Sequence, residues 1–190
     1  DWDFDAVVHS HVFEHMHSTS CFLNKLNKFV PEGGYHIFSV PNMVPQLKNY
    51  FLSCLDFEHT YFLSERFIEY YMEKYGFEII DKKYYLEDHS IFYATRRNSR
   101  IKAIDLPHDY ESNKALFKDY VQHYYDEVGR INSLIYKSIH PLYLFGAHIF
   151  SQYLIAFGLE TNKIITILDN STLKRGKRLY GTDFTVSSPD

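Results

Sequence analysis

Apolar strand-like segments alternate with amphipathic helical segments along the first 97 residues, and this order constrains the fold most strongly. Residues 4–10 (FDAVVHS) are typical of a short buried strand, whereas residues 19–29 place apolar side chains at helical spacing. VPEGG then supplies a glycine turn before a second strand, YHIFSV, at residues 35–40. A strand–helix–strand order of this kind is typical of an α/β sheet.

The next segments predict a helix followed by a hairpin. In SERFIEYYMEKYG, Ser64 stands at the expected cap and Gly76 at the expected stop of an amphipathic helix. Residues 77–97 contain two strand-like runs that only the short sequence EDH separates, which predicts antiparallel pairing. We therefore expect an α/β sheet with an antiparallel edge.

A second, smaller α/β unit is expected after a polar boundary at residues 98–109. One long amphipathic helix is predicted from Tyr110 to about Ile139. After Pro141 come a strand (LYLFG), a helix (AHIFSQYLIAFGL) and a strand (KIITILDN). A right-handed crossover would make these two strands parallel.

Composition excludes several classes of protein. The 190 residues carry a net charge of -4, so no basic field favours nucleic acid. Two cysteines are too few for a disulfide framework, and a reducing cytoplasm is the expected location. No apolar run reaches 18 residues, so no membrane span is predicted.

The sequence HSHVFEH, at residues 9–15, places three histidines and one acid directly after the first strand. Ligands bind beyond the carboxyl ends of strands in open α/β sheets, which makes this segment a candidate binding turn. A turn that merely needs polar residues is the alternative. His11 and His15 have the i,i+4 spacing of a shared metal site, but a flanking acid and third ligand of a known zinc motif are missing. We therefore predict no metal.

Three stretches resemble known enzymes. Residues 4–42, FDAVVHSHVFEHMHSTSCFLNKLNKFVPEGGYHIFSVPN, resemble the fourth strand to the fifth strand of class I S-adenosylmethionine (SAM) methyltransferases. DFEHTYFLSERFIEYYMEKYGFEII is similar to a segment of sugar C-methyltransferases. LYLFGAHIFSQYLIAFGL, with ITILDNSTLKRGKRLYGTDFTVSSP, resembles the extra Rossmann-like domain that ends those enzymes.

This resemblance implies an α/β fold in three parts. Residues 1–100 would be the second half of a class I methyltransferase Rossmann-like sheet, residues 101–140 a linking helix region, and residues 141–190 a partial Rossmann-like substrate domain. The implied activity is methyl transfer from SAM to a nucleotide-linked keto-sugar, in deoxysugar biosynthesis. The oligomeric state is left open.

The sequence also departs from the family. Its glycine-rich SAM loop, the acid that holds the ribose and the amino-terminal zinc module have no counterpart here. We therefore expect a fragment of a longer protein that does not bind SAM tightly alone, because no glycine cradle receives the methionine moiety. In the catalytic segment, Phe57 replaces the family's first histidine and Asp56 a tyrosine, while Glu58 and His59 are kept.

The resemblance assigns catalytic roles to His59, Glu58 and His15. Methylation of a carbon requires a base to remove a proton next to the ketone and a donor to stabilise the enolate oxygen. Histidine suits the base because its ordinary pKa is about 6.5. We expect His59 to be the base, Glu58 to orient it or bind the sugar, and His15 to stabilise the enolate or bind substrate. The alternative is that His59 is a surface residue of a helix-cap region.

Further residues are predicted to bind ligands. At the first strand end, His9, Ser10 and His11 are expected to face the cofactor. In the second unit, the turn FGAHIFS is a weak dinucleotide signal, and a packing turn is the alternative. The residues expected to contact the nucleotide-sugar there are Gly146, Ala147, Asp169 and Asn170.

Two other functions stay open. A sugar O-methyltransferase would use the same histidine to deprotonate an alcohol. A non-catalytic remnant that lacks its cofactor half would act as a scaffold or have no activity.

Overall fold

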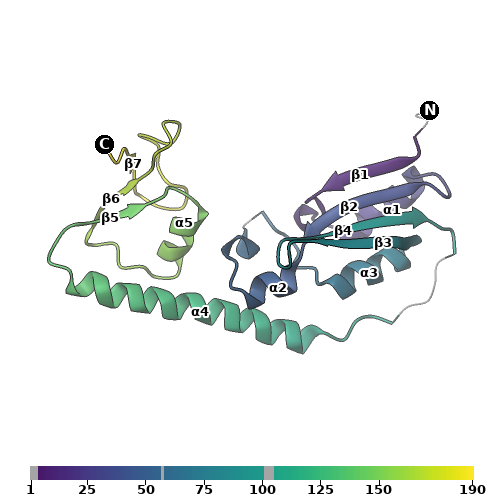
Figure 1. Cartoon of the computed structure of the whole chain (residues 1–190), viewed down its shortest axis with the longest axis horizontal. Coiled ribbons are helices and arrows are strands. Elements are labelled where there is room, and N and C mark those ends of the chain that lie inside the picture. Colours follow the sequence, from purple (N-terminus) through teal and green to yellow (C-terminus); the bar gives the residue numbers. More distant parts are fainter. Residues whose placement is uncertain (1–3, 57, 101–104) are drawn as a thin grey trace. The chain divides into compact units, whose positions relative to one another are not determined.

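The computed structural model describes residues 4–56, 58–100 and 105–190. The chain forms two compact units, residues 1–116 and 117–190, and the boundary falls inside the long helix α4 (Tyr110–Lys137) (Figure 1). Each unit has its own sheet. Among the described residues, no helix has both the length and the apolar character needed to cross a membrane.

The first unit contains a mixed four-stranded sheet. The strands lie in the order β1-β2-β4-β3, with β1 parallel to β2 and the other neighbouring pairs antiparallel. Their bounds are β1 (Ala6–Ser10), β2 (Tyr35–Pro41), β3 (Phe77–Tyr85) and β4 (Ser90–Arg97). The predicted strand–helix–strand order and antiparallel hairpin are both confirmed.

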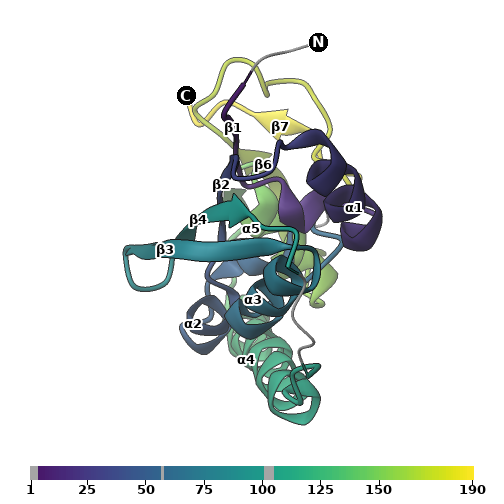
Figure 2. The ribbon, with the colours of Figure 1, turned by 90° about the vertical axis from the view of Figure 1, so that its right-hand side faces the viewer.

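Helices α1 (Thr19–Phe29) and α3 (Glu65–Lys74) pack against one face of this sheet (Figures 1 and 2). Ser18 caps α1 by accepting a hydrogen bond from the Cys21 amide, at 3.3 Å. Ser64 is the N-cap residue of α3 as predicted, although its buried hydroxyl makes no capping hydrogen bond. Three short helices were not predicted: η1 (Phe13–His15), α2 (Met43–Lys48) and η2 (Leu52–Leu55).

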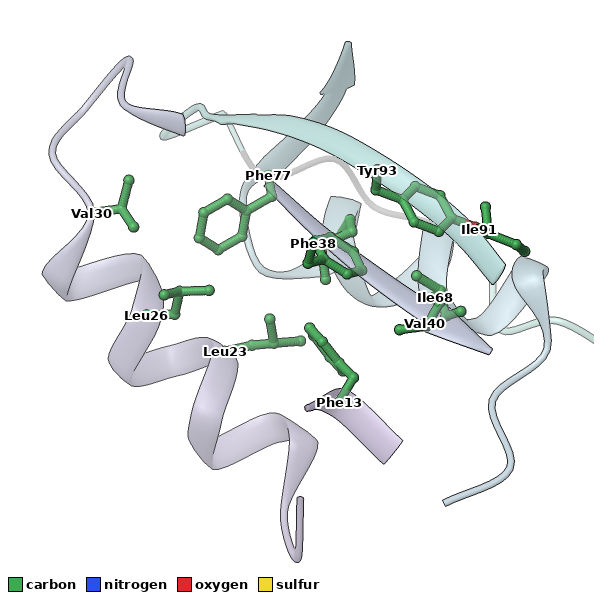
Figure 3. Close-up of a cluster of buried hydrophobic side chains, with 11 residues drawn as sticks. Phe13, Leu23, Leu26, Val30, Phe38, Val40, Ile68, Phe77, Ile91 and Tyr93 are labelled. Atoms are coloured by element: carbon green, nitrogen blue, oxygen red, sulfur yellow. The ribbon is translucent and has the colours of Figure 1, made fainter. Parts of the chain in front are cut away.

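The core of the first unit lies between its sheet and the helices α1 and α3 (Figure 3). Phe13 is fully buried and extends from η1 into this core, with its ring centroid 5.1 Å from that of Phe38 on β2. The helical side contributes Leu23, Leu26, Ile68 and Met72, and the strands contribute Phe38, Val40, Phe77, Ile91 and Tyr93. Phe13 therefore anchors the short helix that also carries Glu14 and His15.

Two histidines belong to the same side of the sheet. His36 on β2 is fully buried, and its Nε2 lies 2.9 Å from Nε2 of His9 on β1. The His36 ring stacks on Phe38, with centroids 4.5 Å apart. Burial, followed by the neighbouring His9, lowers the pKa of His36 to about 3. His36 is therefore a neutral core residue at physiological pH.

The second unit has a parallel three-stranded sheet in the order β5-β6-β7. Its elements are β5 (Leu142–Phe145), α5 (Ile149–Ala156), β6 (Ile164–Leu168) and β7 (Val186–Ser187). The strand–helix–strand order and parallel pairing are confirmed, although α5 is shorter than expected and β7 was not predicted. Val128 and Ile135 of α4 join Leu154 and Ile164 in one of its buried clusters.

Replacing Phe13 should destabilise the first unit. We expect Phe13→Ala to lower the free energy of unfolding by about 3–5 kcal/mol, because it opens a cavity in a close-packed core. The matched control is Phe92→Ala, since Phe92 is 44% exposed on β4, and its loss should cost about 1 kcal/mol or less. Urea unfolding followed by circular dichroism measures both. Equal losses would contradict the anchoring role of Phe13.

The buried histidine pair should make stability depend on pH. The folded state lowers the pKa of His36 from its ordinary 6.5 to about 3, so the unfolded chain binds the proton more readily. The stabilising contribution is complete above about pH 6.5 and is lost as the pH falls toward 3. We expect His36→Phe to reduce the fall of the urea midpoint between pH 7 and 5. His17→Phe, at an exposed position, should leave that fall unchanged, and a similar fall in all three proteins would contradict the assignment.

Candidate active site

A clamp of hydrogen bonds joins the segment after β1 to the loop after η2. The Thr60 amide donates to the Glu14 carbonyl oxygen at 2.7 Å, and the Thr60 hydroxyl donates to the Met16 carbonyl oxygen at 2.6 Å. The Tyr61 hydroxyl donates to the His17 carbonyl oxygen at 2.9 Å. Residues more than 40 positions apart in the sequence are thus held side by side.

This clamp brings His15 and His59 together. Their ring centroids are 5.0 Å apart, with the rings at 63° in an edge-to-face arrangement. His15 Nδ1 donates to the Glu58 carbonyl oxygen at 3.0 Å, which leaves Nε2 directed elsewhere. Among the described residues, neither ring nitrogen of His59 has a hydrogen-bond partner. The two histidines that the sequence singled out therefore share one place in the fold.

Glu14 completes the cluster. It is only 5% exposed, and neither carboxylate oxygen accepts a hydrogen bond from the residues that the structure describes. Its Oε1 lies 3.1 Å from His11 Nδ1, which is an ion-pair distance when that imidazole is protonated. One ligand atom each from Glu14, His15 and His59 lie within 4.8 Å of one another. The sequence analysis had not assigned Glu14 a role.

A small, largely apolar pocket adjoins the cluster. Glu14, His59 and Tyr61 line it together with apolar side chains that include Phe13, Val40 and Met43. Cys54 also lines it, and burial raises the pKa of this thiol to about 12, so it is not a thiolate nucleophile at neutral pH. The other polar side chains that line the pocket are those of Glu14, Gln46, His59 and Tyr61.

Glu58 contributes to the site through its backbone. Its carbonyl oxygen accepts the hydrogen bond from His15, while its side chain is exposed. Its amide donates to Asp56 Oδ1 at 3.1 Å, which shapes the turn before His59. The departure from the family at Phe57 lies outside the described residues. The buried carboxylate beside the imidazoles is therefore that of Glu14.

The three predicted cofactor-binding side chains all have partners within the chain. His9 packs in the core against His36. The Ser10 and Ser39 hydroxyls are hydrogen-bonded at 2.7 Å. His11 adopts a positive φ of 51° and places Nε2 3.0 Å from the Ser90 hydroxyl. All three side chains are thus engaged within the chain, although the buried His9 Nδ1 has no hydrogen-bond partner among the described residues.

The sequence signal for Glu14 and Tyr61 was weak. Glu14 stands directly before His15 in HVFEH, but an acid at that place is equally consistent with a helix cap. Tyr61 follows the Glu-His pair by two residues and is one of 17 tyrosines, so its position alone carried no information. Only the contacts between the two distant segments distinguish these residues from surface ones.

In the second unit, three of the four predicted substrate-binding residues meet at the ends of β5 and β6. Gly146 adopts a φ of 101°, which favours glycine, and the next amide, Ala147 N, donates to Asp169 Oδ2 at 2.8 Å. Asn170 is exposed beside them. Hydrogen bonding from the Ser171 amide, followed by the Lys174 ammonium, lowers the pKa of Asp169 to about 2. The Asp169 carboxylate is thus held as an anion by the chain itself.

Comparison with known proteins gives one family match. Residues 3–82 match the family model described as a methyltransferase domain. No curated protein matches the chain. The matched range runs from β1 into β3 and includes Glu14, His15 and His59. The match covers less than half of the chain and shows that this part is similar to a methyltransferase domain, and the mixed α/β architecture is consistent with a Rossmann-like methyltransferase fold.

Proposed function

We propose that this chain carries the acceptor side of a SAM-dependent methyltransferase that acts on a nucleotide-linked keto-sugar, with C-methylation through an enolate. The observation that supports it most directly is the convergence of His15 and His59 beside the buried Glu14. General bases act only within hydrogen-bond reach of the proton they remove, so a lined pocket with an unpaired imidazole is the necessary geometry.

In this proposal, a ring nitrogen of His59 accepts the proton from the carbon next to the sugar ketone. Its nitrogens are suited to this because no described residue occupies them. Removal of that proton by a positioned base contributes about 10²–10⁴-fold to such a step. The electron pair left on carbon is delocalised onto the ketone oxygen, so the enolate needs a hydrogen-bond donor.

His15 is the proposed donor to the enolate oxygen. Because Nδ1 already donates to the Glu58 carbonyl, only Nε2 is available, and it donates only when the ring is protonated. A ligand oxygen of the Glu14 carboxylate lies within 4.8 Å of a ring nitrogen of His15. The exposed Glu58 side chain is proposed to bind a sugar hydroxyl.

SAM, when bound, supplies the electrophilic methyl group. We assign no role in methyl transfer to His9, Ser10 or His11, since their side chains are engaged within the chain. The second unit is proposed to bind the nucleotide part of the substrate at the turn of Gly146 and Ala147. The Ala147 amide already donates to the Asp169 carboxylate, so the exposed Asn170 is the side chain with most freedom to contact the nucleotide.

A non-catalytic role is the second candidate. It is favoured by the engaged side chains at residues 9–11 and by the small size of the pocket at His59. Methylation of a sugar hydroxyl is a variant of the first proposal, in which His59 removes a proton from an alcohol. Exchange of carbon-bound hydrogen separates these alternatives because only an enolate mechanism produces it.

Loss of the base should abolish exchange at the sugar carbon. We expect the chain to catalyse deuterium incorporation next to the ketone of a nucleotide-linked keto-sugar without SAM, and His59→Ala to slow it by about 10²–10⁴-fold. Proton NMR of the sugar in D₂O measures the rate. His17→Ala, which removes an exposed ring and keeps the backbone carbonyl of the clamp, should retain it. Exchange at the wild-type rate in His59→Ala would contradict the proposal.

Cofactor binding by this chain alone should be weak. We expect isothermal titration calorimetry with SAM to give no saturable signal, because the polar side chains at residues 9–11 are paired within the chain. A longer protein that also carries a glycine-rich strand–turn–helix should bind saturably. Tight binding by the 190-residue chain would contradict this reading of the strand end, and binding in neither protein would favour the non-catalytic role.

A further inference from the structure

We propose that Glu14, His15 and His59 form a binding site for one divalent transition-metal ion of the zinc class, and that the bound ion blocks proton transfer by His59. The first part stands on the cluster itself, and the second part rests on the proposed function. Sequence reasoning predicted no metal because it considered only His11 and His15. In the folded chain, the group of possible ligands includes His59 and does not include His11.

The ligand set matches a known type of zinc site. Two imidazoles and one carboxylate, with a fourth position left open, are the protein ligands of one class of zinc enzyme. The three ligand atoms lie within 4.8 Å of one another. A tetrahedral ion with bonds of about 2.0–2.2 Å separates its ligands by about 3.3 Å. Side-chain rotations that bring the atoms closer by about 1–1.5 Å would therefore complete the coordination.

Glu14 supplies the independent observation that points to a cation. Its carboxylate is buried, and neither oxygen has a hydrogen-bond donor among the described residues. A buried carboxylate in this condition requires a partner. His11 Nδ1 lies 3.1 Å from Oε1 without making a hydrogen bond to it, whereas a divalent cation would satisfy the carboxylate directly.

His15 already has the surroundings of a metal ligand. Its Nδ1 donates to a backbone carbonyl, that of Glu58, so the neutral ring keeps its lone pair on Nε2. Histidines that bind metals commonly have this second hydrogen bond, which fixes the tautomer and the ring orientation. His59 is placed opposite by the clamp at Thr60 and Tyr61. The backbone segments that carry both imidazoles are therefore held side by side before any ion arrives.

The donor types select the ion. Imidazole nitrogens favour Zn²⁺ and neighbouring transition metals, whereas Mg²⁺ and Ca²⁺ prefer sites made of oxygen. An ion bound by His59 would occupy the lone pair that the proposed base uses. The site would act as an inhibitory switch on the proposed proton transfer.

Direct metal titration tests the site without any assay of activity. The untagged 190-residue chain, freed of metal with a chelator, would be titrated with ZnCl₂ in competition with a chromophoric chelator. We expect one tightly bound ion per chain, and at least ten-fold weaker binding in Glu14→Gln, His15→Ala and His59→Ala. His17→Ala should bind as the wild type does. Absence of tight binding, or equal binding in all variants, would overturn the site.

Cobalt substitution gives a second readout that needs no variant to fold. The wild-type chain loaded with Co²⁺ should show the intense visible absorption of a four- or five-coordinate ion, and one equivalent of Zn²⁺ should remove it. A weak octahedral spectrum would overturn the proposal even where a variant proves unstable.

Inhibition is measured with the exchange assay. One equivalent of Zn²⁺ should slow deuterium incorporation at least ten-fold, and excess chelator should restore it. Exchange that continues in the zinc-loaded chain would overturn the inhibitory role. Zinc binding in a chain that never catalyses exchange would contradict the proposed function but support the metal site.

Discussion

The candidate site depends on the hydrogen bonds by which Thr60 and Tyr61 hold the backbone carbonyls that follow β1. Three carbonyl oxygens of this segment, those of Glu14, Met16 and His17, accept from these two residues. Carbonyls beyond the end of a strand have no ladder partner and must be satisfied elsewhere. The loop that satisfies them also carries His59, so one backbone requirement positions both imidazoles.

Sequence periodicity predicts most helices and strands of the first unit, and there are physical reasons why it does not predict the others. Helix α1 was predicted with its observed bounds, Thr19–Phe29, because its apolar stripe is regular and a glycine turn follows. Helix α2 was missed because it has only six residues and contains Pro45, and short helices are stabilised by tertiary contacts. The convergence of His15 and His59 came from the family resemblance, since no local pattern links residues 44 positions apart.

The strand end illustrates why polar residues next to a sheet edge are not automatically ligands. Side chains alternate along β1, so Val7 and His9 face the helices while Val8 and Ser10 face the other side. His9 consequently meets His36 and the buried aromatic rings of β2 and η1. The strand period was available in the sequence, but the identity of its inward neighbour, His36, depends on the register with β2.

Glu14 is where local consistency is broken, and that makes it the most informative residue in the unit. An unpaired buried carboxylate destabilises a fold, while the fully buried Phe13 beside it holds the same short helix in the core. The packing of Phe13 thus offsets a cost that Glu14 imposes. A buried carboxylate is least destabilising where a cation, either an imidazolium or a metal ion, lies next to it. Both proposals therefore depend on a positive charge next to the buried Glu14 carboxylate. In the first proposal this charge is a protonated imidazole, and in the second it is a metal ion bound by His15 and His59.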